Sequence, residues 1–357
     1  MEPEVLFDEA DGIGTITLNR PRTLNALTMN MIAEMRTRFT AWMADDAIKA
    51  VVIKGAGDRA FCAGGDVRAV RQSIVEYDGD ANPELAQEFF YEEYILNHQI
   101  HTSAKPYIAL IDRVCMGGGV GLSVHGSFRV ATERTRVGMP ETTIGLFPDV
   151  GGAWFLSRLP GETGTYLALT GVPVTVGDCE QLGISTHVVS SDKLEEIEAA
   201  LHAADLSGDA HAAVKAVLDG DVIDGGEAPT VAARAEIDHC FAPDSMGEIV
   251  ARLEASDSEF AAHALETLAS KSPTSLKVTL EQIRRGGRAT TFAETMTMEY
   301  RMSQHFARAN DFPEGVRALL VDKDHKPDWK PARLEDVSEA AVAGYFEPVP
   351  WRELTFD

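Results

Sequence analysis

Residues 107–121 read YIALIDRVCMGGGVG, a strand-like apolar run followed by a turn and a cluster of glycines. The run Tyr107–Ile111 is typical of a short buried strand. The glycines at 117–119 permit a sharp turn and open a second apolar stretch, which predicts a helix ending near His125. The fold prediction therefore begins from a unit of strand, glycine loop and helix.

The same order occurs on both sides of this stretch. Ala50–Ile53 is another short apolar run that leads into a glycine-rich loop, and Phe128–Ala131 is a third. A long helical stretch is expected from Pro83 to His101, before the strand at Tyr107–Ile111. Strands and helices that alternate in this way favour an α/β fold with parallel strands.

The amino-terminal region predicts a hairpin and then a helix. The short runs VLF and TITL flank Asp11–Gly14, a turn-rich tetrapeptide, as in a β-hairpin. Thr28 is placed to cap the helix that follows. Its apolar residues recur at spacings of three and four and form one face: Ile32, Met35, Phe39 and Trp42.

Length and charge bound the organisation. At about 150 residues per domain, 357 residues predict either two equal domains or one large domain with a satellite. We expect an α/β core with the active site over 1–190 and a mainly helical region over 191–357.

The formal net charge of −24 argues against nucleic acid and anionic membranes as partners. Residues 178–260 hold 19 acidic against four basic residues, which is typical of solvated amphipathic helices.

The cysteines and histidines predict neither a disulfide scaffold nor a metal site. Cys62, Cys115, Cys179 and Cys240 are far apart and form no C-x-x-C motif, and the histidines show no H-E-x-x-H or H-x-H spacing. The amino terminus lacks a signal pattern, and no stretch approaches the roughly 18 apolar residues that span a bilayer. We therefore expect a cytoplasmic protein without metal.

Two glycine clusters are candidate anion-stabilising loops. Phe61–Asp66, FCAGGD, leaves a strand and places Asp66 to cap a helix that begins at Val67. Gly117–Gly121 opens the next helix, where N–H groups lack partners within the helix. Such donors stabilise a developing oxyanion. A tight turn into a helix, or close helix packing, explains the same glycines, and Cys62 is interpreted as a small buried filler.

A third stretch, Met139–Gly152, carries two carboxylates among apolar and turn residues. Glu141 and Asp149 lie eight residues apart, which places both at the rim of a partly desolvated pocket. Buried carboxylates are costly without partners, and this favours a functional use. The alternative for Asp149 is that it caps a helix over Ala153–Leu159.

In this order, the segments resemble the crotonase (enoyl-CoA hydratase/isomerase) superfamily over about 4–190 and 262–325. The motifs are NRPRTLNAL at 19–27, FCAGGD at 61–66, MGGGVG at 116–121, MPETTIGLFPDVGG at 139–152 and DFPEGVRALLVDKD at 311–324. The 3-hydroxyisobutyryl-CoA hydrolase group is most similar, through GGGVGLSVHG at 117–126, SPTSLK at 272–277 and TMEYR at 297–301. The likeness implies a spiral of ββα repeats with carboxy-terminal helices at about 262–325, an acidic helical segment at about 191–260 and an extension at 326–357.

The resemblance also implies site residues. The backbone N–H groups of Gly65 and Gly118 would hold a thioester oxygen. Hydratases of the superfamily place a glutamate at the position of Gly121, so this chain departs from their pattern. Glu141 and Asp149 match the two acids of the hydrolase group. In Glu92-Glu93-Tyr94, Glu93 matches a substrate contact, although an exposed helix charge explains it equally.

The expected function is hydrolysis of 3-hydroxyisobutyryl-CoA or a similar hydroxyacyl-CoA. Glu141 would attack the thioester or act as general base, and Asp149 would orient water or bind the 3-hydroxyl. The alternatives are an enoyl-CoA hydratase/isomerase and a catalytically silent acyl-CoA-binding protein.

The partners expected follow from the same likeness. No separate cofactor is implied because coenzyme A is part of the substrate, and superfamily members form trimers or hexamers. Candidate cations for its phosphates are Arg22, Arg59, Arg68 and a basic cluster from Lys271 to Arg288, for which surface solubility is the alternative.

Overall fold

The computed structural model describes residues 2–79 and 82–356. The chain forms two compact units that interleave along the sequence. Unit 1 comprises Met1–Gly65, Ile95–Gly138 and Val174–Val231, and unit 2 comprises Asp66–Tyr94, Met139–Pro173 and Ala232–Asp357. These units interleave and are not divided at residue 190. The expected division into 1–190 and 191–357 stays a prediction about the order of regions along the chain.

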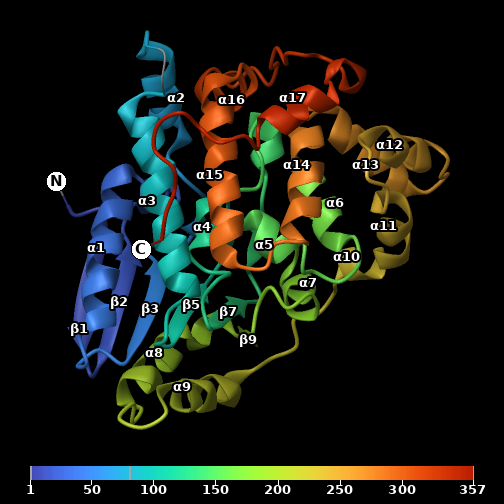
Figure 1. The fold of residues 1–357 in the computed structure, drawn as a ribbon. Helices are drawn as coiled ribbons and strands as arrows, with labels where there is room; N and C mark the ends of the chain where they lie inside the picture. Colours follow the sequence, from blue (N-terminus) through green and yellow to red (C-terminus); the bar gives the residue numbers. More distant parts are fainter. Residues whose placement is uncertain (1, 80–81, 357) are drawn as a thin grey trace. The chain divides into compact units, whose positions relative to one another are not determined.

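Unit 1 contains two sheets (Figure 1). The larger has the order β1-β2-β3-β5-β7-β9, with β1 and β2 antiparallel and the other pairs parallel. The smaller is parallel, with the order β4-β6-β8. The strands are β1 Val5–Ala10, β2 Ile13–Leu18, β3 Ala50–Gly55, β4 Ala60–Cys62, β5 Tyr107–Ile111, β6 Val114–Met116, β7 Phe128–Thr132, β8 Arg136–Gly138 and β9 His187–Val189.

Successive strands alternate between the sheets. From β3 to β8 the chain adds one strand to the larger sheet and the next to the smaller, and a helical segment follows each pair. These segments are α2 Val67–Glu76, α4 Gly118–Gly121 and the 3-10 helix η2 Glu141–Ile144. The spiral of ββα repeats implied by the resemblance is therefore confirmed.

The amino-terminal predictions are also confirmed. Asp11 and Gly12 form the hairpin turn with φ of 53° and 79°, the left-handed conformation that suits a two-residue turn. Helix α1, Met29–Ala44, is capped by Thr28, whose Oγ1 accepts a 3.2 Å bond from the Met31 N–H. Its predicted apolar face is buried, and Figure 1 shows α1 lying across the first strands.

The acidic region begins with helices that complete the core of unit 1. Apolar side chains of α8, Leu194–Ala203, and α9, Ala210–Leu218, pack against residues of β2, β3, β5 and β7. These helices turn their charged residues outward, as expected for solvated amphipathic helices. The other helical segments of this unit are η1 Pro21–Thr23, α7 Val176–Gln181, η3 Ser191–Lys193, η4 Asp219–Asp221 and most of α10 Pro229–Ala232.

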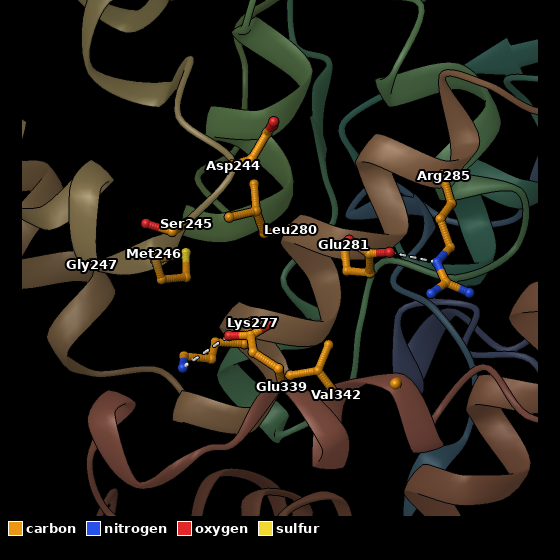
Figure 2. Close-up of a pocket in the computed structure, with 11 residues that line it drawn as sticks. Asp244, Ser245, Met246, Gly247, Lys277, Leu280, Glu281, Arg285, Glu339 and Val342 are labelled. Carbon is orange, nitrogen blue, oxygen red and sulfur yellow. Dashed lines mark hydrogen bonds and ion pairs between the residues drawn. The ribbon is translucent and has the colours of Figure 1, made fainter.

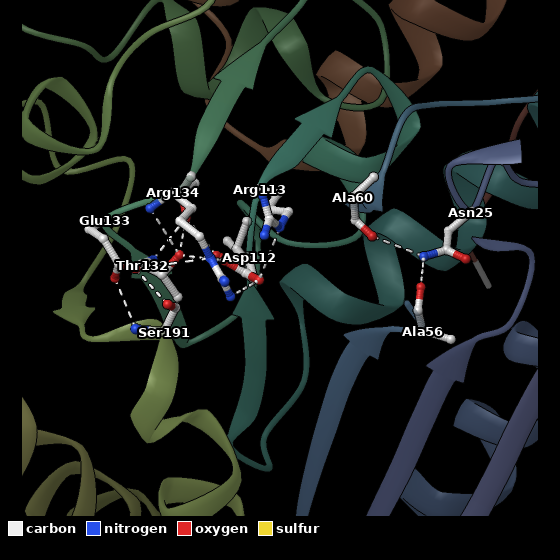
Figure 3. A network of polar contacts seen from close by, with 11 residues as sticks. Asn25, Ala56, Ala60, Asp112, Arg113, Thr132, Glu133, Arg134 and Ser191 are labelled. Atoms are coloured by element: carbon white, nitrogen blue, oxygen red, sulfur yellow. Dashed lines mark hydrogen bonds and ion pairs between the residues drawn. The ribbon is translucent and has the colours of Figure 1, made fainter. Parts of the chain in front are cut away.

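Polar contacts connect the strand ends of unit 1 (Figure 3). After β5, the Asp112 carboxylate accepts a 2.6 Å hydrogen bond from the Thr132 hydroxyl and forms an ion pair with the Arg134 guanidinium at 2.5 Å. Glu133 accepts from the N–H and hydroxyl of Ser191 at 2.9 and 2.5 Å. These contacts hold the ends of β5 and β7 and the start of the acidic region together.

Unit 2 is helical in the part of the chain that the structure describes. Helix α14 packs on α5 and α6, and α15 packs on α5 and α16 (Figure 1). A hydrogen bond from Gln282 to Glu299 joins α14 to α15. No described helix is long and apolar enough to cross a membrane. The helices are α2, the first part of α3 Glu84–His101, η2, α5 Gly152–Leu156, α6 Thr163–Thr170, α11 Arg234–Phe241, α12 Met246–Glu254, α13 Glu259–Ala269, α14 Pro273–Gly286, α15 Phe292–Arg308, α16 Asp311–Val316, the π-helix η5 Arg317–Val321, η6 Leu334–Asp336 and α17 Glu339–Gly344.

Candidate active site

The two glycine clusters lie in contact within unit 1. A methyl group added at Gly119 would lie 2.4 Å from the Cys62 carbonyl oxygen, and one at Gly64 would lie 3.7 Å from the Gly118 nitrogen. Gly64 also has a φ of 106°, which side chains rarely adopt. Close packing of the two loops therefore accounts for Gly64 and Gly119, the role of their neighbours as N–H donors to a ligand stays a prediction, and Cys62 is buried as expected.

The structure brings Gly65 and Gly118 into these neighbouring loops. Gly118 is the first residue of α4, so its N–H lies outside the ladder of bonds within the helix. Gly65 forms a bridge with Leu27, in which the Leu27 N–H donates to the Gly64 carbonyl at 2.9 Å. An oxyanion is stabilised by N–H donors of this kind, so the role of Gly65 and Gly118 stays a prediction.

Asn25 supports the first of these loops, a role that the sequence did not reveal (Figure 3). This residue is buried with a φ of 56°. Its Nδ2 donates to the carbonyls of Ala60 and Phe61 at 3.0 and 3.2 Å, and its Oδ1 accepts from the Arg20 N–H at 2.9 Å. The NRPRTLNAL motif at 19–27, which contains Asn25, was the available signal, but Ala60 and Phe61 lie 35 and 36 residues away along the chain.

Helix α2 begins at Val67, as predicted. The Asp66 side chain makes no capping bond to the described residues 67–76 of this helix, so that detail is wrong. Its φ of −77° and ψ of 65° depart from the extended backbone of most capping residues.

Unit 2 gathers the three predicted carboxyl groups. Glu93, Glu141 and Asp149 are 2%, 6% and 6% exposed. The Tyr94 hydroxyl donates to Asp149 Oδ2 at 2.9 Å. Glu93 is therefore not an exposed helix charge. Asp149 does not cap α5, because Gly151 occupies the capping position and helix α5 begins at Gly152.

Burial makes these carboxyl groups weak acids. Burial first, and then the charge of Asp149, raises the pKa of both Glu93 and Glu141 well above the ordinary value for a glutamate. Burial also raises the pKa of Asp149 to about 7, against the hydrogen bond from Tyr94, which lowers it. Carboxyl groups that exchange a proton near neutral pH suit general acid and base chemistry.

Two carboxyl oxygens of the cluster are unsatisfied. Among residues 2–79 and 82–356, no group hydrogen-bonds to the buried Oε1 of Glu93 or Oε2 of Glu141. Leaving such atoms unpaired is costly, so each one calls for a partner from outside the described chain. A ligand or water that donates a hydrogen bond to either atom would remove this cost.

Glu299 and Gln282 are further buried polar residues of unit 2 that sequence reasoning missed. The Glu299 carboxylate accepts from the N–H groups of Gly151 and Ala153 at 2.7 and 2.8 Å. Burial raises its pKa to about 8, and these two N–H bonds oppose the shift. The TMEYR motif at 297–301 was the only sequence signal.

The basic cluster from Lys271 to Arg288 is mostly engaged within the protein. Lys271 donates to the Thr143 hydroxyl at 2.7 Å, and Lys277 to the Val337 carbonyl at 2.7 Å. Arg284 pairs with Glu162 and Asp244, and Arg285 pairs with Glu281. These contacts favour a structural use of the cluster, whereas Arg22, Arg59 and Arg68 are exposed.

Two of these cations line a cavity of about 390 Å³ in unit 2 (Figure 2). Lys277 and Arg285 share it with three acids, Asp244, Glu281 and Glu339, so its lining is not cationic. Figure 2 shows Arg285 paired with Glu281 and Lys277 with Glu339. A phosphate would have to displace these carboxylates. Among residues 2–79 and 82–356, no group of three or more histidine, cysteine, aspartate or glutamate side chains is arranged to hold a metal ion.

A known protein family matches most of this chain. A sequence model described as "Enoyl-CoA hydratase/isomerase" matches residues 13–346. The chain belongs to this enoyl-CoA hydratase/isomerase family. The resemblance seen in the five motifs is thereby confirmed.

Relatives within the enoyl-CoA hydratase/isomerase family extend over nearly the whole chain. The 3-hydroxyisobutyryl-CoA hydrolase, mitochondrial, of Danio rerio is 48% identical over 98% of this chain and 91% of its own length. The protein of that name from Homo sapiens is 44% identical over 99% and 91%. A crystal structure described as a carnitinyl-CoA dehydratase from Mycobacterium thermoresistibile is 40% identical, with a TM-score of 0.92 over 100% of this chain and 99% of that one.

These family members correct one expectation. Both hydrolases are named mitochondrial, so the predicted cytoplasmic location is wrong. The four cysteines are buried and free, which fits either location.

Proposed function

We propose that this protein hydrolyses a short-chain hydroxyacyl-CoA thioester, with 3-hydroxyisobutyryl-CoA as the substrate and 3-hydroxyisobutyrate and free coenzyme A as products. The observation that carries the proposal is the buried pair Glu141 and Asp149, with the pKa of Asp149 near 7. The names of relatives that are 44% and 48% identical over nearly the whole chain support the same substrate.

The reaction needs a nucleophile, proton transfer and stabilisation of one negative oxygen. The oxygen of water attacks the thioester carbonyl carbon, the C–S bond breaks, and the departing sulfur receives a proton. We assign the oxyanion to the N–H groups of Gly65 and Gly118, whose loops are in contact in unit 1. No separate cofactor is required because coenzyme A leaves as the product thiol.

Glu141 is assigned the first step. As a general base it would take a proton from water, and as a nucleophile it would form a mixed anhydride that water then opens. Its unsatisfied Oε2 is the atom available for either role. Asp149, held by Tyr94, would orient the water or accept a hydrogen bond from the substrate 3-hydroxyl, and Glu93 would contact the substrate through its unsatisfied Oε1.

The alternative function is hydration or dehydration, because the crystal structure with a TM-score of 0.92 is described as a carnitinyl-CoA dehydratase. Gly121 argues against that alternative. It is a buried helical glycine at the position where the hydratases carry a glutamate, so this chain lacks one carboxylate of the hydratase pair.

A substrate test separates these functions. Thiol release from 3-hydroxyisobutyryl-CoA and loss of the enoyl absorbance of crotonyl-CoA are measured in parallel. Thiol release alone supports hydrolysis, and enoyl loss alone supports the hydratase. Acyl-CoA binding without either reaction supports a catalytically silent binding protein, and both of the last two outcomes overturn the proposal.

The catalytic assignment is tested with Glu141→Gln. Loss of general acid or base catalysis lowers kcat by about 10²- to 10⁴-fold. Glu254→Gln, the same substitution at an exposed position of unit 2, is the matched control and should keep the wild-type rate. A near-normal rate in Glu141→Gln would show that Glu141 does not perform the step assigned to it.

A further inference from the structure

Glu299 binds the backbone of the segment that carries Asp149. This residue of α15 is fully buried, and each oxygen of its carboxylate accepts a backbone N–H bond. Gly151 donates to Oε2 at 2.7 Å and Ala153 donates to Oε1 at 2.8 Å. Both donors lie within four residues of Asp149, on the carboxy-terminal side.

Gln282 of α14 holds the other side of the same segment. Its Nε2 donates to the Pro148 carbonyl at 2.7 Å and to Glu299 Oε1 at 3.1 Å. The backbone is therefore bound immediately before Asp149 and again two and four residues after it. These contacts join α14, α15 and residues 148–153 in one hydrogen-bonded network.

The segment needs such support because of its backbone conformation. Val150 has a φ of 51° and Gly151 a φ of 83°, so two consecutive residues are left-handed. A β-branched residue strongly disfavours this region, and it persists only where the surroundings impose it. A bound Gly151 N–H and a bound Pro148 carbonyl supply that constraint on either side of Val150.

We propose that Glu299 is a positioning residue, which acts through Asp149 by fixing the backbone of residues 148–153. The inference rests on the proposed function of Asp149. Two acceptor oxygens are required, since Glu299 receives N–H donors from both Gly151 and Ala153. A glutamine has the same shape but offers one acceptor oxygen and one NH2 donor. Its NH2 group would then face the N–H of Gly151 or Ala153, with which it cannot form a hydrogen bond.

The first test compares Glu299→Gln with Asp178→Asn. Asp178 is the matched control because it is a buried carboxylate of unit 1 that accepts from the N–H groups of Thr230 and Val231 at 2.9 and 3.1 Å. Glu299→Gln should lower kcat about 10- to 100-fold and change KM less than about threefold, as expected for misplacement of a reacting group. Asp178→Asn should lower the melting temperature and keep kcat. An unchanged kcat in folded Glu299→Gln overturns the proposal.

A double variant tests whether Glu299 acts through Asp149. In an Asp149→Asn background, Glu299→Gln should change kcat by less than about threefold, because residues that act as a unit are not additive. The same fold loss in both backgrounds would show that Glu299 acts independently and would overturn the proposal. If Glu299→Gln does not fold, Gln282→Met removes the Pro148 contact and carries the same test with a smaller expected loss.

An infrared titration separates this inference from the proposed function. The protonated carboxyl band of Asp149 is identified by its loss in Asp149→Asn. Its midpoint should move in Glu299→Gln and stay in Asp178→Asn. A wild-type protein that releases no thiol overturns the proposed function, whereas the midpoint still decides the role of Glu299. A midpoint that does not move overturns that role.

Discussion

Replacing Asp149 by asparagine should stabilise the protein at alkaline pH while lowering its activity. The pKa of Asp149 is about 7 in the folded chain, against an ordinary value of 3.8. Well below pH 3.8 the carboxyl is protonated in both the folded and the unfolded chain, so its pKa shift does not reduce the unfolding free energy. As pH rises, the unfolded chain releases this proton first, so stability is lost until the folded group has also ionised.

The magnitude follows from the two pKa values. A difference of about three units corresponds to about 4 kcal/mol of unfolding free energy lost above pH 8, at about 1.4 kcal/mol per unit. At pH 5 the loss is only about 1.5–2 kcal/mol, so the advantage of Asp149→Asn over wild type should grow by about 2–3 kcal/mol between pH 5 and pH 8. Asparagine keeps an acceptor for the Tyr94 hydroxyl, so that bond survives.

Urea unfolding of both proteins at pH 5 and pH 8 measures this difference. Asp46→Asn, which removes an exposed carboxylate, controls for the change in net charge. The expected result is a stability gain that increases with pH, accompanied by a lower kcat for thiol release. The reasoning is refuted if the difference between the two proteins is the same at both pH values, or if Asp149→Asn is the less stable protein at pH 8.

Two further predictions concern the same groups and the glycine loops. Tyr94→Phe removes the 2.9 Å hydrogen bond that lowers the Asp149 pKa, so the acid limb of the pH profile of kcat/KM should move up by roughly one to two pH units. If the acid limb does not move, a group other than Asp149 controls it. Gly119→Ala places a methyl group 2.4 Å from the Cys62 carbonyl and should destabilise the fold by about 1–3 kcal/mol and lower kcat. Gly208→Ala, where a methyl group meets nothing within 4 Å, is its control, and an equal loss of kcat in both variants would rule out the loop contact as the cause.

The features predicted from the sequence are those set by local chemistry. The Asp11-Gly12 turn, the Thr28 cap and the buried face of α1 follow from conformational preference and from a spacing of three and four residues. The ends of β5 match the predicted range Tyr107–Ile111 because short apolar runs bounded by turns have few alternatives. The prediction from local preference was wrong at Asp66. This residue lacks the extended backbone of a capping residue, and its side chain makes no capping bond to the described helix α2.

The residues that hold the backbone around Asp149 could not be predicted from local sequence patterns. Glu299 binds N–H groups that are 148 and 146 residues away, and Gln282 binds a carbonyl 134 residues away. Long-range hydrogen bonds leave no periodic pattern in the sequence. The carboxyl groups themselves were predictable because Glu141 and Asp149 stand among apolar residues, where an ionisable side chain is costly.

The packing of α8 and α9 on the larger sheet bears on how this chain can be shortened or recombined. Leu201, Val214 and Leu218 belong to the same apolar cluster as strand residues such as Ile108 and Val130. A chimera that replaced residues 194–218 with a short linker would expose one face of the sheet to water. Residues 194–218 are therefore part of the scaffold of unit 1, and their charged residues form the water-facing side of an otherwise apolar layer.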